Sequence, residues 1–203
     1  MYFKDKNMLF IHIPKCGGNT IMDYFKDRNG DEKKIHWSAA QYRKENKVKF
    51  LQCFVFTFVR NIFQQLVSMY EYSKFLHSFI KNISFQEFLT SDNVICQRLR
   101  QAVIQKNYIY DKNINCVSYI GDINNASFHL ENICDYLKLD FCSTIPHSNK
   151  NNLPDYRTYL NGKIIDKIKS EFSVDIDFFG YDPYDIIKIK NIGFIKKNQC
   201  KFI

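Results

Sequence analysis

The chain has 203 residues, of which 45% are hydrophobic, and a formal net charge of +8. This length and apolar content allow a packed core and exclude a disordered chain. No apolar run approaches the roughly 20 residues that span a bilayer, and the N-terminus has no signal-peptide pattern, so we expect a soluble, cytoplasmic protein without a transmembrane segment. The seven cysteines lack the paired spacing of disulfide frameworks and metal sites, which predicts free thiols and no metal.

The first motif is an apolar run, Met8–Ile13, that ends at the segment Pro14–Thr20, with a helix predicted from Ile21 to Arg28. A strand, a glycine turn and a helix in this order build an anion site, because glycines admit a ligand close to the backbone and the helix start presents N–H groups. Lys15 adds a mobile charge and Thr20 a hydroxyl. We expect a phosphate or sulfate group to bind here.

Two common phosphate loops do not fit this segment. A Walker A loop places its lysine after the glycines and before Ser or Thr, whereas Lys15 precedes Gly17 and Gly18. A cysteine-based phosphatase would need an arginine six residues after Cys16, where the chain has Met22.

The second motif follows another apolar run, Phe54–Val59, which predicts a strand buried on both faces. Arg60 and Asn61 end this strand, and a helix is predicted from Ile62 with Ile62, Leu66, Val67 and Tyr70 on its apolar face. Arg60 therefore lies at the carboxyl end of a strand, where open α/β sheets bind ligands. Its planar guanidinium suits a terminal phosphate.

Together, the Pro-Lys-x-Gly-Gly-x-Thr loop and the Phe-Val-Arg-Asn stretch, with Ser68 eight residues after Arg60, resemble the two phosphate motifs of the carbohydrate-type sulfotransferases, which include the heparan sulfate 2-O-sulfotransferases and bacterial relatives. The resemblance covers residues 8–182. It implies an α/β fold: a single P-loop-like domain, 1–185, with a central parallel sheet flanked by helices, followed by a basic tail, 186–203. The chain looks like a free, bacterial member of this family.

The resemblance also implies the donor, 3′-phosphoadenosine 5′-phosphosulfate (PAPS), and the residues that hold it. Lys15 would contact the bridging oxygen and the departing 5′-phosphate, while Arg60 and Ser68 would bind the 3′-phosphate. Pro146–Lys150 resembles a late loop that closes over the nucleotide. The cofactor-binding residues expected in this way are Lys15, Cys16, Gly17, Gly18, Asn19, Thr20, Arg60, Ser68, Asn149 and Lys150.

The expected catalytic residues are Lys15 and a histidine that acts as general base. His36 lies between the two phosphate motifs, at the separation from Arg60 where related enzymes place their catalytic histidine. We interpret His12 as a packed strand residue and expect His77 and His129 on solvated helix faces. Cys16 at a helix start could be a nucleophile, but we interpret it as a small filling residue.

The resemblance to this family is weaker in the later segments of the chain. A helix is predicted over Asn125–Leu137, with Phe128, Leu130, Ile133 and Leu137 near one another on its face, and we interpret Asp175–Tyr181 as packing and a turn. The acceptor pocket would come from residues 75–115, which resemble nothing assignable. We expect the acceptor to be a glycan or small-molecule hydroxyl, and the basic charge suits an anionic one; we expect no nucleic acid partner. A P-loop kinase that uses ATP and a non-catalytic nucleotide-binding protein remain the alternatives.

Overall fold

The computed structural model describes residues 1–25, 35–146, 154–186 and 188–195. The chain is a mixed α/β protein that divides into two compact units. Unit 1 comprises Met1–Val59, Gln105–Lys150 and Asn191–Ile203, and unit 2 comprises Arg60–Ile104 and Asn151–Lys190. Each unit is therefore assembled from segments that are distant in the sequence.

Unit 1 is built around a five-stranded sheet with the strand order β1-β2-β3-β6-β7. The three inner strands run parallel, with Phe10 opposite Phe56 and Phe56 opposite Tyr119, whereas both edge strands run antiparallel to their neighbours. The sheet is thus mixed, with a parallel centre. Its strands are β1 (Tyr2–Phe3), β2 (Met8–Ile11), β3 (Phe54–Val59), β6 (Tyr119–Asp122) and β7 (Gly193–Phe194).

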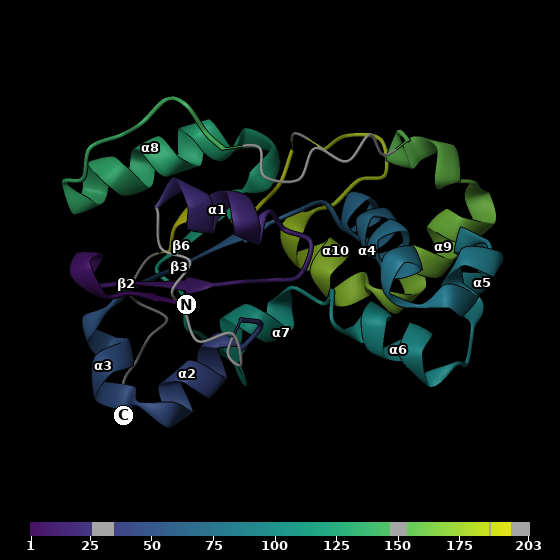
Figure 1. Ribbon diagram of the computed structural model, residues 1–203, viewed down its shortest axis with the longest axis horizontal. Helices are drawn as coiled ribbons and strands as arrows, with labels where there is room; N and C mark the ends of the chain where they lie inside the picture. The colour runs from purple at the N-terminus through teal and green to yellow at the C-terminus, as the bar shows by residue number, and fades with distance from the viewer. Residues whose placement is uncertain (26–34, 147–153, 187, 196–203) are drawn as a thin grey trace. The chain divides into compact units, whose positions relative to one another are not determined.

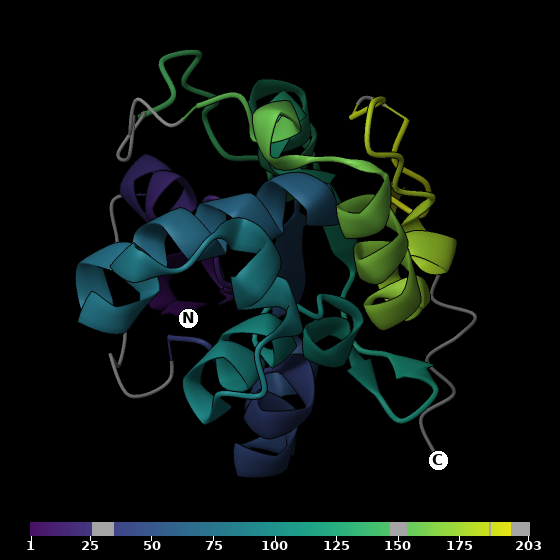
Figure 2. The same ribbon diagram turned by 90° about the vertical axis from the view of Figure 1, so that its right-hand side faces the viewer.

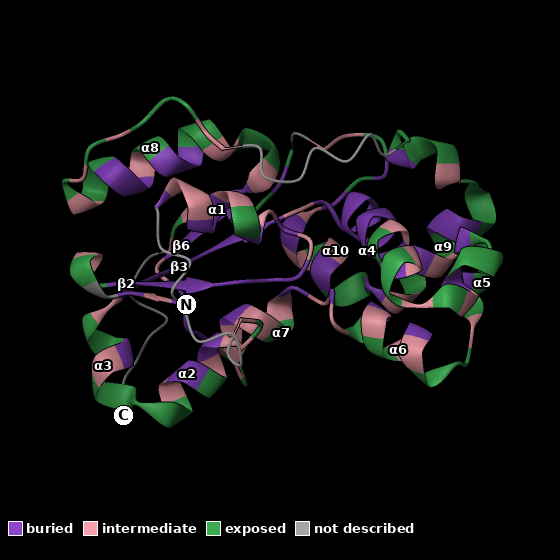
Figure 3. Cartoon of the chain, in the orientation of Figure 1, coloured by how far each residue is buried: buried purple, intermediate pink, exposed green. Residues whose placement is uncertain are grey.

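Helices cover both faces of this sheet (Figure 1). One face carries α1 (Gly18–Tyr24) and α8 (Ala126–Leu137), and the other carries α2 (Ala39–Glu45), α3 (Lys47–Gln52) and α7 (Lys106–Ile109). The inner strands are buried along their whole length (Figure 3). The smaller elements of the unit are the 3-10 turns η1 (Lys4–Lys6) and η4 (Ile123–Asn125) and the hairpin of β4 (Tyr110–Asp111) and β5 (Ile114–Asn115).

In the described part of unit 2, every regular element is a helix (Figure 2). The longest is α4 (Ile62–Leu76), whose residues from Ile62 to Tyr70 are all buried. The others are η3 (Ser78–Asn82), α5 (Phe85–Thr90), α6 (Val94–Gln101), η5 (Tyr156–Tyr159), α9 (Gly162–Glu171) and α10 (Ser173–Phe179).

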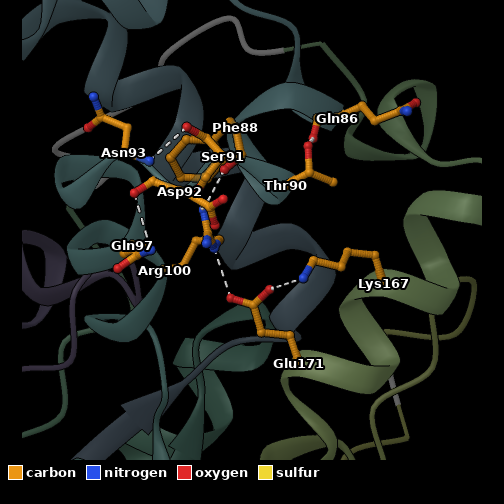
Figure 4. Close-up of polar contacts among 10 residues, drawn as sticks. All are labelled: Gln86, Phe88, Thr90, Ser91, Asp92, Asn93, Gln97, Arg100, Lys167 and Glu171. Carbon is orange, nitrogen blue, oxygen red and sulfur yellow. Dashed lines mark hydrogen bonds and ion pairs between the residues drawn. The ribbon is translucent and has the colours of Figure 1, made fainter.

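A buried arginine joins three helices of unit 2 (Figure 4). Arg100 of α6 donates from Nη1 to the carbonyls of Phe88 and Ser91 at the end of α5, at 2.7 and 3.1 Å, and from Nε to Glu171 of α9 at 2.8 Å. Glu171 is also paired with Lys167, 3.0 Å away on the same helix. The guanidinium thus satisfies two carbonyls that the end of α5 leaves without intrahelical partners.

The strand, the helix and the apolar stripe expected for the second motif are confirmed. β3 ends at Val59, α4 begins at Ile62, and the predicted apolar stripe is buried. Asn61 caps the helix by accepting from the Phe63 amide at 3.1 Å, and its side-chain amide donates to the Asp182 carbonyl at 2.8 Å. The cap gives a partner to an amide at the start of α4 that has none within the helix.

The first predicted helix has a different start. The chain becomes helical at Gly18, three residues before the expected Ile21, because Gly17 adopts a left-handed conformation and takes the capping position. Helix α1 is described as far as Tyr24, and residues 26–28 of the prediction lie outside the described residues.

The helix predicted over Asn125–Leu137 is α8; Leu130 and Ile133 of its apolar face are buried, whereas Phe128 is 53% exposed. The expectation for His129 is wrong. His129, expected to be solvated, is buried, and its Nδ1 and the Tyr119 hydroxyl form a hydrogen bond of 2.8 Å. The hydroxyl of Tyr119 on β6 gives the buried His129 ring a hydrogen-bond partner. Burial of the ring lowers the pKa of His129 to about 4.

The predicted tail, 186–203, contributes β7 to the sheet of unit 1. Phe194 packs there on Tyr119 and Tyr136, with ring centroids 4.8 and 4.9 Å apart, and Ile195 donates its amide to the Ser118 carbonyl. Residues 187 and 196–203 lie outside the described residues.

Candidate functional site

The glycine loop of unit 1 connects β2 to α1 through a tight turn. Lys15 and Gly17 both have positive φ angles, of 64° and 75°, and the Cys16 amide donates to the Ile13 carbonyl at 3.3 Å. The turn leaves Asn19 exposed and Lys15 and Thr20 partly exposed, while Cys16 is buried. Polar side chains of the predicted phosphate loop are therefore accessible to a ligand.

Two neighbouring side chains explain why both loop glycines are required. A Cβ atom on Gly17 would overlap Ile123 of η4, in addition to the strain of its positive φ. A Cβ atom on Gly18 would overlap the imidazole of His12. The first position thus demands glycine for its backbone and its packing, and the second demands it because a buried ring occupies the space.

Alanine at position 18 should damage the loop. We expect Gly18→Ala to lower the free energy of unfolding by about 1–3 kcal/mol, the usual cost of overpacking, because the His12 ring must shift. The measurement is urea unfolding followed by circular dichroism. Gly162→Ala is the matched control, since a Cβ at Gly162 meets nothing within 4 Å. Equal stability of the two variants would show that the contact with His12 is unimportant.

His36 lies beside this loop and His12. Its ring centroid is 4.5 Å from that of His12, and its Nδ1 lies 3.2 Å from the His12 backbone carbonyl oxygen. A carbonyl oxygen only accepts, so Nδ1 must carry the proton and, in the neutral ring, Nε2 carries the lone pair. This is the tautomer that a general base requires.

The electrostatic surroundings keep His36 in its neutral form. Partial removal of the ring from water lowers the pKa of His36 below its ordinary value of 6.5, the hydrogen bond to His12 opposes this, and the Lys15 charge lowers it further. The residue nevertheless retains solvent exposure. At neutral pH His36 is therefore an accessible, unprotonated imidazole next to a lysine.

Cys16 is held away from solvent. It is 1% exposed, and its thiol lies 3.9 Å from the Gln105 side-chain oxygen. This burial agrees with a filling residue whose contribution to a ligand comes from its backbone, and a buried thiol is a poor nucleophile.

The second predicted phosphate motif belongs to unit 2. Arg60 follows β3 directly and is partly exposed, while Ser68 is 8% exposed in α4. The structure brings Lys15, Gly17, Gly18 and His36 together within unit 1; Arg60 and Ser68 are described within unit 2. Asn149 and Lys150 lie outside the described residues.

Sequence reasoning missed two parts of this region. The ring of His12 lies between Gly18 and His36. The only sequence signal for this position is strand alternation, which places residues 10 and 12 on the same face of the sheet. Asp122, at the end of β6, caps η4 by accepting from the Asn124 amide at 3.0 Å. A carboxylate directly after a strand is a common cap, so this signal was available in the sequence.

Comparison of the chain with protein-family models, curated proteins and solved structures found no match. Within the described ranges, no helix is both long and apolar enough to cross a membrane. Among the same residues, no cluster of three or more His, Cys, Asp or Glu side chains is arranged to hold a metal ion.

Proposed function

We propose that the protein is a sulfotransferase that moves the sulfuryl group of PAPS to a hydroxyl of a glycan or glycan-bearing acceptor. The observation that carries this proposal is the position of His36 beside the glycine loop, with Nδ1 held by the His12 carbonyl and Nε2 as the proton acceptor. A base next to an anion-binding loop is the arrangement that group transfer from a phosphosulfate requires.

In the proposed reaction the bond between sulfur and the bridging oxygen breaks as a bond from sulfur to the acceptor oxygen forms. His36 Nε2 takes the proton of the acceptor hydroxyl. The electron pair of the broken bond stays on the departing 5′-phosphate, where Lys15 and the loop amides stabilise its charge. This assignment gives Gly17, Gly18, Asn19 and Thr20 the non-bridging oxygens and needs no metal ion.

The 3′-phosphate of the donor is assigned to Arg60 and Ser68. The parallel inner strands β2, β3 and β6 support a P-loop-like arrangement, since Arg60 follows the carboxyl end of the middle one. The Asn61 cap fixes the start of α4, the helix that carries Ser68.

Calorimetric titration with 3′-phosphoadenosine 5′-phosphate, without added metal, tests the donor site. We expect the wild-type protein to bind this desulfated product and to prefer it to ATP. Arg60→Ala should weaken the binding about 10- to 100-fold, because a hydrogen-bonded charge contributes about 1.5–3 kcal/mol.

Arg98→Ala is the matched control, because Arg98 is an exposed arginine of α6 in the same unit. It should bind the product as the wild type does. A preference for ATP with magnesium would instead support a kinase, and the absence of binding to either nucleotide would overturn the proposal.

A further inference from the structure

His12 is a buried imidazole that contacts both halves of the site in unit 1. It is 7% exposed and stacks on Phe10, with centroids 5.7 Å apart and planes 16° from parallel. Its other neighbours are the His36 ring, at 4.5 Å and tilted by 57°, and the backbone of Gly18. The ring therefore forms a wall between the glycine loop and His36.

Packing alone fixes the His12 ring. Its Nδ1 is buried and has no hydrogen-bond partner among the described residues. The position of the ring is restricted by its stacking on Phe10 and by the space that the absent Cβ of Gly18 provides. By contrast, the His36 ring makes one hydrogen bond to the part of the chain that the structure describes, at the His12 carbonyl, so its orientation also depends on what packs against it.

The charges around the pair keep this wall neutral. Burial lowers the pKa of His12 to about 3, and His36, the Met1 amino group and Lys15 lower it in the same direction. The charge of Lys15 also lowers the pKa of His36. His12 thus remains an uncharged aromatic ring while His36 gains and loses a proton.

We propose that His12 is a positioning residue for His36: its ring holds the His36 imidazole with Nδ1 on the His12 carbonyl and Nε2 available to a substrate. The aromatic ring performs this role, and its protonation is not involved. This inference rests on the proposed role of His36 as the base, but the orientation itself can be measured in the protein without any ligand.

The test is nitrogen-15 NMR of the histidine rings in the wild type, His12→Ala and His12→Phe. In the wild type, neutral His36 should be the Nδ1–H tautomer. His12→Ala removes the wall, so His36 should become a mixture of both tautomers and its pKa should move toward 6.5. His12→Phe keeps an aromatic ring of similar size and should restore the single tautomer.

Steady-state kinetics give the second readout. In His12→Ala, kcat should fall about 10- to 100-fold, as expected for a misplaced catalytic group, while affinity for 3′-phosphoadenosine 5′-phosphate stays close to that of the wild type. His12→Phe should recover most of kcat. The Gly18 backbone is not changed in either variant.

The outcomes separate this inference from the proposed function. A His36 tautomer and pKa unchanged in His12→Ala would overturn the positioning role, and a stability loss without these changes would show that His12 only fills the core. A changed tautomer in a protein that binds no nucleotide would uphold the positioning role and overturn the sulfotransferase assignment. If His12→Ala fails to fold, His12→Phe becomes the test, and a mixture of both His36 tautomers in that variant would overturn the inference.

Discussion

If the protein is the proposed sulfotransferase, we expect replacement of His36 by alanine to lower kcat for sulfuryl transfer by about 10²- to 10⁴-fold, the range for loss of a general base. The affinity for 3′-phosphoadenosine 5′-phosphate should stay near the wild-type value, because the proposal assigns His36 to the acceptor proton and the loop to the donor. The measurement is transfer of labelled sulfate from PAPS to an oligosaccharide acceptor found by screening neutral and anionic glycans.

The pH dependence of the wild-type rate provides an independent check. Protonated His36 cannot accept a proton, so the rate should fall as the pH drops through the pKa of this ring. Since the site lowers that pKa, the fall should lie below pH 6.5. The fall should disappear in His36→Ala.

His77→Ala is the matched control for this variant. His77 ends α4, away from the glycine loop in sequence, and is a partly exposed histidine of unit 2. It should turn over at the wild-type rate. If His36→Ala were as active as His77→Ala, the general base would be another residue, and a protein without turnover in any form would be a nucleotide-binding module.

The largest loss of stability is expected at Arg100. We expect Arg100→Met to lower the free energy of unfolding by about 3 kcal/mol, at the low end of the range for breaking a buried ion pair, because Glu171 keeps Lys167 as a partner. The same substitution also removes the hydrogen-bond donor of the Phe88 and Ser91 carbonyls, and this loss is part of the total. Urea unfolding followed by circular dichroism measures the change.

An exposed ion pair of the same unit gives the comparison. Arg157 and Asp155 are 3.2 Å apart, with side chains 48% and 52% exposed. Arg157→Met should lower the free energy of unfolding far less than Arg100→Met, because exposed ion pairs contribute little to stability. Similar losses in the two variants would mean that burial of Arg100 adds nothing to its contribution.

Local patterns in the sequence predicted the segments whose structure depends on near neighbours. The apolar run Phe54–Val59 is a fully buried strand, and the helix predicted from Ile62 is α4, which Asn61 caps. In both, the pattern that predicts the element lies within a few residues along the chain.

Long-range interactions explain what the sequence did not reveal. His129 turned inward because Tyr119, on a neighbouring strand, offers it a hydroxyl. Arg100 could not be recognised as a buried cation, since its carboxylate partner is Glu171, on a helix 71 positions away in the sequence. The site shows the same limit: the glycine loop was visible as a motif, but the contact of His36 with His12 appears only when α1 and β2 are in place.

The segmented composition of the two units constrains how the protein can be divided. The chain passes from one unit to the other after Val59, Ile104, Lys150 and Lys190. After a single proteolytic cleavage, the two units therefore remain covalently connected through the other points at which the chain passes between them. Neither unit can be expressed as one uninterrupted fragment, and a gene for unit 1 alone would need two new linkers to rejoin its three segments.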